Sequence, residues 1–179
     1  LSLDGKVAIV TGGAGGIGQA TIRLMIGRGA RVAIADINVD GARAIAAKYG
    51  GAALAVGMDL TDEGSIAVMV RQVVEHFGRI DILHNNAAAV GAKLVAADRG
   101  VADMPTWAWD TFFNVNCRGT MIVTREVLPH LTRTKGSIVI TVSGLGLQGN
   151  VVSAGYGATK AALIQLTRSI ATAYGRKGV

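Results

Sequence analysis

Short apolar runs alternate along the chain with stretches in which apolar residues recur at about every third or fourth position. A short continuous apolar run is typical of a buried strand, and the wider spacing is typical of an amphipathic helix. On this pattern five strands are predicted, at residues 6–11, 31–36, 52–56, 80–84 and 137–142. The helices that follow them are predicted at residues 17–29, 40–49, 66–77, 106–129 and 155–174.

The strict alternation of strands and helices predicts an α/β fold. We expect a doubly wound, Rossmann-type parallel sheet with helices on both faces. Right-handed crossovers predict the strand order 3-2-1-4-5. Residues 89–105 show no such pattern and are predicted to form an irregular loop, and Thr106 is predicted to be the N-cap of the next helix. No repeat, low-complexity tract or linker divides the chain, so residues 1–179 are interpreted as a single domain.

A glycine-rich turn lies directly between the first predicted strand and the first predicted helix. Gly12, Gly16 and Gly18 have the spacing G-x-x-x-G-x-G. Such a turn lets a pyrophosphate approach the backbone, and the N-terminus of the helix offers free N–H groups and the positive end of a dipole. The pattern predicts a dinucleotide site. The alternative is that the glycines serve only the packing of the helix against the strand.

Asp36 ends the second predicted strand. A carboxylate at this place accepts hydrogen bonds from the adenosine ribose hydroxyls and repels a 2′-phosphate. No Lys or Arg lies in the glycine turn, and Ile37 and Asn38 after the acid are uncharged. NAD(H) is therefore favoured over NADP(H), with a solvated carboxylate at a strand end as the alternative.

Polar side chains also follow the third and fourth predicted strands. Asp59 precedes Leu60, and Asn85-Asn86 is followed by two alanines. Because parallel strands end at one edge of a sheet, both segments can reach the same nucleotide. Asp and Asn also serve ordinary turns, so the residues alone leave both interpretations open.

Tyr156 and Lys160 are four residues apart in the last predicted helix, which places both side chains on one face. Ser143 lies thirteen residues before Tyr156, at the end of the fifth predicted strand. A phenol, an ammonium and a hydroxyl that converge are the groups needed to move a proton at an alcohol or a carbonyl. To act as a base, Tyr156 would need its pKa lowered by roughly two to three units from about 10. The positive charge of Lys160 is expected to contribute to this shift.

Composition restricts the function classes further. The net charge is +6, and residues 117–179 hold eight basic residues and one acidic residue. These basic residues are scattered, with few aromatic residues among them, which does not favour nucleic-acid binding. One cysteine, and three histidines without zinc-ligand spacing, predict no metal site. No apolar run reaches transmembrane length, so a cytoplasmic protein without a membrane partner is expected.

The motifs together resemble the classical short-chain dehydrogenases/reductases over residues 5–179. The segment Thr11–Gly18 is similar to the cofactor fingerprint of that family, and Asp59-Leu60 is similar to its adenine-contacting pair. Asn85-Asn86-Ala87 resembles the N-N-A-G motif, with Ala88 in place of the glycine. The catalytic tetrad of the family is matched by Asn116, Ser143, Tyr156 and Lys160.

The resemblance implies an oxidoreductase that transfers a hydride between NAD(H) and a secondary alcohol or ketone, with Tyr156 as general acid/base. It implies that Ser143 binds the substrate oxygen, that Lys160 also binds the nicotinamide ribose, and that Asn116 holds a water that relays the proton. It also implies a homodimer or homotetramer that pairs through the two long helices. The cofactor-binding residues are expected to be Gly12, Gly15, Gly16, Ile17, Gly18, Asp36, Asp59, Leu60, Asn86, Ala87, Tyr156 and Lys160.

The end of the chain is expected to be a truncation. Gly175–Gly178 closes the last helix, and Val179 looks like the start of another strand. The usual chain of the family continues with a sixth strand and a substrate-covering region. Residues 1–179 are therefore interpreted as an NAD(P)-binding Rossmann domain that stops before those parts, and a small alcohol or ketone substrate is expected without being identified.

Two other functions fit parts of the pattern. A protein of the same fold that binds NAD(H) without turnover, as a sensor, would share every cofactor motif. An S-adenosylmethionine methyltransferase also uses a glycine turn and an acid at a strand end, but it does not explain Tyr156, Lys160 and Ser143. The oxidoreductase is therefore the leading interpretation.

Overall fold

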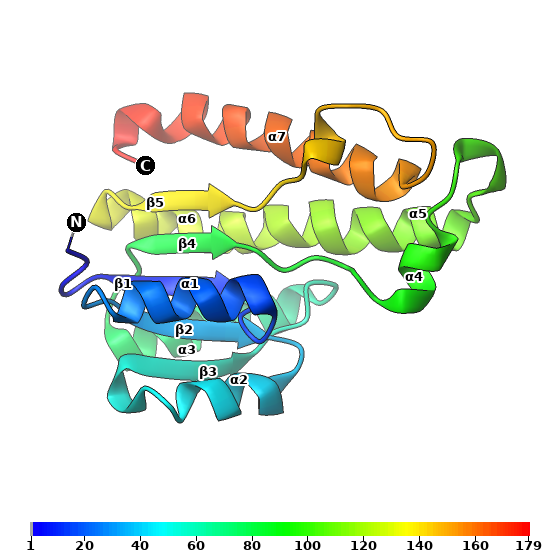
Figure 1. The fold of residues 1–179 in the computed structure, drawn as a ribbon. Coiled ribbons are helices and arrows are strands. Elements are labelled where there is room, and N and C mark those ends of the chain that lie inside the picture. Colours follow the sequence, from blue (N-terminus) through cyan, green and yellow to red (C-terminus); the bar gives the residue numbers. More distant parts are fainter. Residues whose placement is uncertain (1) are drawn as a thin grey trace.

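The chain forms a five-stranded parallel sheet with helices on both faces (Figure 1). The computed structural model describes residues 2–179, and Leu1 lies outside the described residues. The strands run in the order β3-β2-β1-β4-β5, all parallel, which confirms the predicted fold class and strand order. Their bounds are β1 (Val7–Thr11), β2 (Arg31–Asp36), β3 (Ala53–Gly57), β4 (Ile82–Asn85) and β5 (Ser137–Ile140).

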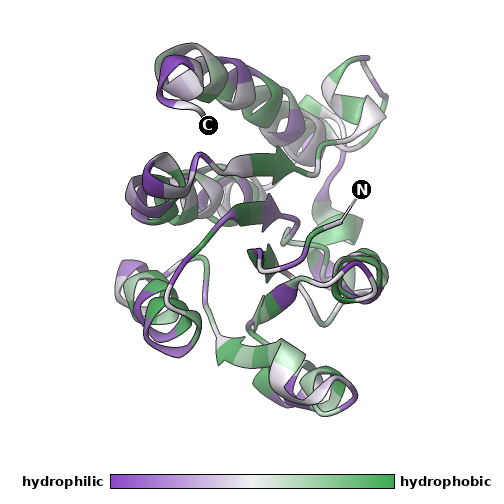
Figure 2. Cartoon of the chain, turned by 90° about the vertical axis from the view of Figure 1, so that its left-hand side faces the viewer, coloured by the Kyte–Doolittle hydropathy of each residue, from purple (hydrophilic) through white to green (hydrophobic). Residues whose placement is uncertain are grey.

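The helices divide between the two faces of the sheet (Figure 2). α1 (Gly16–Ile26) and α2 (Val39–Ala46) cover one face. α3 (Glu63–Phe77) and α6 (Thr120–Thr134) cover the other, where α7 (Ala154–Tyr174) also lies. Right-handed crossovers produce this division, because the strands first move outward from β1 to β3 and then outward on the other side of β1. Within residues 2–179, no helix combines the length and the apolar character that a bilayer span needs.

The central strands are buried on both faces, which explains their continuous apolar runs. In β1, Val7 and Ile9 pack into the cluster under α3 and α6, whereas Ala8 and Val10 pack into the cluster under α1 and α2. All five residues of β1 are buried. The turn that follows β1 therefore starts from a strand that is held on every side.

The segment between β4 and the long helix is more ordered than predicted. Residues Ala92–Ala97 form a short helix, α4, and Val101–Asp103 form a 3-10 turn. The prediction of an irregular loop over 89–105 is wrong for these residues. α4 has only six residues, too few to show a helical period in the sequence, and Leu94 anchors it in a cluster with Ala108 and Phe112.

The long helix predicted from residue 106 is interrupted in its middle. α5 (Thr106–Phe112) continues through a π-helical segment, Phe113–Gly119, into α6. Pro105 is the N-cap residue, so the prediction of Thr106 as the cap is wrong by one position. π-helical turns inside longer helices are frequent at functional sites, and this one contains Asn116.

Asp81 joins the amino ends of β1 and β4, at the end of the sheet opposite the glycine turn. Its buried carboxylate accepts a hydrogen bond from the backbone N–H of Val7 (3.0 Å) and two from Arg79 (2.9 and 2.7 Å), and Lys6 Nζ lies 3.5 Å away. Burial acts to raise the pKa of Asp81, but the hydrogen bonds from Arg79 and Val7 and the nearby positive charges hold it below its usual value. The folded state therefore favours the charged carboxylate.

We expect Asp81→Asn to destabilise the fold by about 1–3 kcal/mol at pH 7, because it weakens the bonds to Val7 and Arg79. A carboxylate whose pKa is lowered on folding stabilises the protein above its unfolded pKa of about 4, and this stability is lost as the pH falls through the folded pKa. Urea unfolding of wild type and variant at several pH values should therefore show a difference that shrinks in acid. A difference that does not depend on pH would contradict this account. Asp110→Asn is the matched control, because it makes the same chemical change at an exposed position.

Candidate active site

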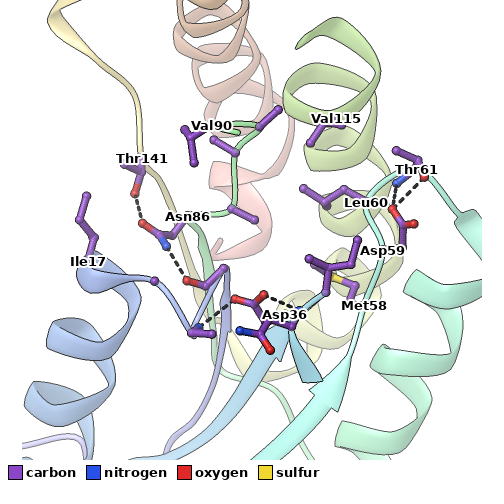
Figure 3. A pocket seen from close by; sticks show the side chains of 18 of the residues that line it. Ile17, Asp36, Met58, Asp59, Leu60, Thr61, Asn86, Val90, Val115 and Thr141 are labelled. Carbon is purple, nitrogen blue, oxygen red and sulfur yellow. Dashed lines mark hydrogen bonds between the residues drawn. The ribbon is translucent and has the colours of Figure 1, made fainter. Parts of the chain in front are cut away.

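An open cavity of about 730 Å³ lies at the carboxyl ends of the strands. Figure 3 shows its wall, with side chains from the segments that follow β1, β2, β3 and β4. Val115 of the π-helical segment and Thr141 after β5 also contribute. The predicted cofactor residues that line this cavity are Gly12, Gly15, Gly16, Ile17, Asp36, Asp59, Leu60, Asn86, Ala87, Tyr156 and Lys160.

The glycine turn after β1 is packed so closely that the backbone leaves no room for a side chain at Gly12 or at Gly18. Gly12 has a φ of 63°, and a Cβ there would lie 2.8 Å from the Cα of Ala87. A Cβ on Gly18 would collide with the carbonyl oxygen of Gly12. Gly18 does not line the cavity, so its role is to let the backbone of the turn pack closely on itself. At Gly16, in contrast, the place of a Cβ is open space, so the backbone there is accessible.

The N-terminus of α1 is directed to this cavity without a side-chain cap. Its N-cap residue is Gly15, and its first turn holds no acidic residue. The first N–H groups of a helix have no partner within the helix, and the helix dipole makes this end positive. Gly15, Gly16 and Ile17 all line the cavity. The arrangement suits an anionic group such as a pyrophosphate.

Two carboxylates are held in the cavity wall by neighbouring donors (Figure 3). The carboxylate of Asp36 accepts hydrogen bonds from the backbone N–H groups of Ala14 and Asn38, both at 2.9 Å. Asp59 Oδ1 accepts from the N–H and from the hydroxyl of Thr61, both at 2.8 Å. A carboxylate has room for further hydrogen bonds. Asp36 can therefore bind hydroxyl groups while it ties the glycine turn to β2.

Hydrogen bonds also join the end of β1 to the end of β4. Thr11 Oγ1 accepts from the backbone N–H groups of Asn86 (2.9 Å) and Ala87 (3.1 Å). The side-chain amide of Asn86 donates to the carbonyl oxygens of Thr11 (3.1 Å) and Gly12 (3.2 Å). Asn86 therefore both lines the cavity and supports the turn. Thr11 opens the predicted fingerprint segment but is not among the predicted cofactor-binding residues, and its role is to join the two strand ends.

Tyr156 and Lys160 both line the cavity from α7. Lys160 is 2% exposed, its Nζ donates to the carbonyl oxygen of Thr141 (2.8 Å), and Nζ lies 5.4 Å from the centre of the Tyr156 ring. Burial lowers the pKa of Lys160, with Cys117 acting in the other direction. Burial raises the pKa of Tyr156. The net shift of the Tyr156 pKa is therefore upward in this structure, opposite to the lowered pKa that a base would need, because desolvation dominates.

Ser143 and Asn116 lie outside the lining of the cavity. Ser143 Oγ accepts from the backbone N–H of Leu145 (3.2 Å), which leaves its hydroxyl proton free to be donated. Asn116 is fully buried; its Oδ1 accepts from the N–H of Ala89 (2.8 Å), and its Nδ2 donates to Thr159 Oγ1 (3.1 Å). The Asn116 side chain therefore links the π-helical segment to the loop after β4 and to α7.

Two further residues that hold this site are absent from the predicted set. Thr141 binds Lys160, and its place at the end of β5 is a usable signal. The carboxylate of Asp98 binds the backbone N–H groups of Gly155 and Tyr156. Asp98 lies in the segment without any periodic pattern, so no signal in the sequence marks it.

A parallel sheet with a glycine turn after its first strand and an acid at the end of its second defines a Rossmann-type dinucleotide-binding protein. A sequence model of the short chain dehydrogenase family matches residues 6–179. The chain therefore belongs to the short-chain dehydrogenase family of oxidoreductases.

Relatives and a solved structure agree with this assignment. The chain is 38% identical to a sorbitol dehydrogenase of Cereibacter sphaeroides, over 100% of this chain and 68% of that protein. It is 36% identical to a meso-2,3-butanediol dehydrogenase of Serratia marcescens, over 100% of this chain and 69% of that protein. The structure of a 3-ketoacyl-(acyl-carrier-protein) reductase from Brucella melitensis complexed with NADH is similar, with a TM-score of 0.91 and 30% identity. That similarity covers 99% of this chain and 73% of the reductase chain.

We expect Asn116→Leu to lower the free energy of unfolding by about 1–3 kcal/mol, because the part-buried N–H of Ala89 loses its acceptor and the buried side chain of Asn116 loses its hydrogen bonds. Asn114→Leu is the matched control, since Asn114 lies exposed on the same π-helical segment, and it should change stability by less than about 0.5 kcal/mol. Urea titrations of both variants measure the difference. Equal effects of the two substitutions would contradict a linking role for Asn116.

Proposed function

We propose that the protein is an NAD-dependent oxidoreductase that transfers a hydride between NAD(H) and a secondary alcohol or ketone. The observation that carries this proposal is that the glycine turn, Asp36, Tyr156 and Lys160 line one cavity. Groups that bind a dinucleotide and groups that move a proton are therefore within reach of one bound molecule. The names of the dehydrogenase relatives and the NADH complex of the reductase support the same reaction class.

The residues of the cavity fit a nicotinamide dinucleotide. The uncapped N-terminus of α1 would hold the pyrophosphate, and the open space at Gly16 leaves room for it. Asp36 would bind the adenosine ribose, with Asp59 and Leu60 beside the adenine. Lys160 would bind the nicotinamide ribose, as the resemblance implies.

Charge in the cavity wall favours NAD(H) over NADP(H). The Asp36 carboxylate would repel a 2′-phosphate. Among the residues that line the cavity in the described part of the chain, Lys160 alone is basic, and it lies beside Tyr156. No basic side chain in this lining is therefore available at Asp36 to pair with a phosphate.

The proposed mechanism assigns proton transfer to Tyr156. In alcohol oxidation the phenolate accepts the proton of the substrate hydroxyl, and the bound cofactor supplies the hydride acceptor. The hydroxyl of Ser143 would donate a hydrogen bond to the substrate oxygen and orient it. In carbonyl reduction, Tyr156 returns its proton to the oxygen. The role of Asn116 in holding a relay water stays a prediction, because both ends of its side-chain amide already have partners.

The raised pKa of Tyr156 has a consequence for the direction of reaction. A protonated phenol is the form that carbonyl reduction needs, whereas oxidation needs the phenolate. The positive charges of Lys160 and of an oxidised nicotinamide both favour the phenolate. Oxidation should therefore speed up as the pH rises toward the Tyr156 pKa, and reduction should slow down.

Exposed apolar side chains on the long helix support the proposal of a homodimer or homotetramer. Trp107, Trp109 and Met121 are 47%, 40% and 39% exposed. Aromatic residues are enriched at the centres of protein–protein interfaces, where they become buried on association.

We expect Tyr156→Phe to lower kcat for oxidation of secondary alcohols by about 100-fold or more, because the variant has no group to take the proton. The affinity for NADH should stay unchanged. Tyr174→Phe at the far end of α7 is the matched control and should keep wild-type activity. The assay is NADH absorbance with a panel of secondary alcohols at several pH values, next to a fluorescence titration with NADH. If wild type and variant bind NADH equally and neither turns over any alcohol, the sensor is the correct function.

We expect Asp36→Asn to lower the ratio of NADP to NAD dissociation constants by about tenfold or more, because the charge that repels the 2′-phosphate is lost. Asp40→Asn is the matched control: Asp40 is an exposed acid on α2, and its substitution should leave this ratio unchanged. Calorimetric titrations with both cofactors give the ratio. A preference for NAD that survives in the Asp36 variant would mean that shape, and not charge, selects the cofactor.

A further inference from the structure

The first turn of α7 is held by a segment more than fifty residues earlier in the chain. Four successive backbone N–H groups at this helix start, those of residues 153–156, find acceptors on Asp98 and Arg99. The carbonyl oxygen of Asp98 accepts from Ser153 (3.0 Å), and that of Arg99 accepts from Ala154 (3.4 Å). The carboxylate of Asp98 accepts from Gly155 (2.8 Å) and from Tyr156 (3.1 Å). All four donors that a helix start leaves without internal partners are therefore bound here.

The residue that would normally cap α7 does not do so. Ser153 is at the N-cap position, but its φ of 69° lies in the left-handed region, and its side chain makes no cap hydrogen bond. A serine caps a helix from an extended backbone, where its oxygen reaches the N–H groups two or three positions ahead. Asp98 supplies this oxygen from another part of the chain.

The Asp98 carboxylate is buried and has a directional role. The residue is 5% exposed, and no ion pair in the described part of the chain includes it. Its stabilisation therefore comes from the two N–H groups and from the positive end of the α7 dipole. Because its two oxygens bind two successive N–H groups, the carboxylate sets the orientation of the turn as well as its position.

The same segment also supports the ring of Tyr156. A Cβ on Gly155 would collide with the side chain of Met104, so α7 packs directly on this segment. The Tyr156 ring packs against Phe112 in an edge-to-face contact, with ring centres 6.2 Å apart, and Leu94 of α4 belongs to the same cluster. Lys160, one turn further along, is held independently by Thr141.

We propose that Asp98 is a positioning residue that sets the place of Tyr156 in the cavity by capping the first turn of α7. The proposal rests on the proposed function in one respect, the role of Tyr156 in proton transfer. Loss of the cap should loosen the first turn, which carries Tyr156. It should leave Lys160, the glycine turn and cofactor binding as they are.

The test compares Asp98→Asn and Asp98→Ala with wild type in the full chain. Asparagine keeps the shape of the side chain and one acceptor oxygen, and alanine removes both acceptors. Asp103→Asn is the matched control, because Asp103 lies exposed on the same segment. We expect kcat to fall by about tenfold or more in Asp98→Asn and further in Asp98→Ala, with the dissociation constant for NADH unchanged. Hydrogen exchange measured by mass spectrometry should speed up at residues 153–157 and stay unchanged in the rest of α7.

Three results would separate the possibilities. Wild-type kcat and wild-type exchange in Asp98→Asn would overturn the proposal. A loss of kcat that only follows the loss of folded protein, with faster exchange along the whole of α7, would also overturn it and leave a general stabilising role. If wild type itself turns over no alcohol, the proposed function fails. The exchange at residues 153–157 then decides by itself whether Asp98 holds the turn that carries Tyr156.

Discussion

The site depends on the hydrogen bonds of Asn86 with Thr11 and Gly12 that join the end of β1 to the end of β4. β1 lies in the middle of the sheet, and the chain moves outward from it first through β2 and later through β4. Ligands of open α/β sheets bind in the crevice where this direction changes. Gly12 permits the join, because a Cβ there would collide with the backbone of Ala87. This close approach brings the glycine turn, Asn86 and Ala87 together in one part of the cavity wall.

Two helix N-termini near the cavity differ in whether their free N–H groups are bound by other parts of the chain. α1 has neither a side-chain cap nor an acidic residue in its first turn, so its N–H groups remain available to an anion. The N–H groups at the start of α7 are all bound by Asp98 and Arg99. An uncapped start attracts a ligand, whereas a capped start presents side chains at fixed places. The first property suits cofactor binding, and the second suits the presentation of Tyr156.

Burial shifts the pKa values of Tyr156 and Lys160 in opposite directions, but in both residues it favours the neutral form. It raises the pKa of the phenol and lowers that of the ammonium, so both neutral forms are favoured relative to water. A charge brought into such an environment is screened less and has a larger effect on the phenol. The protonation of Tyr156 is therefore sensitive to the charge of whatever binds beside it.

The sequence by itself determined the alternation of strands and helices and the place of the glycine turn and of Asp36 at strand ends, because these features depend on local spacing. The strand order followed from the rule of right-handed crossovers. A buried strand next to a glycine turn and a helix is readable within thirty residues, and the acid at the end of β2 is readable in the same way. The short helix α4 packs through Leu94 on Phe112, and the π-helical segment is linked through Asn116 to Ala89 and Thr159, so both belong to the tertiary structure. Tertiary structure also decided the cap of α7, whose partners are 57 and 58 residues apart. The direction of the Tyr156 pKa shift belongs to the same group, because burial depends on how distant segments pack together and no short stretch of sequence contains that information.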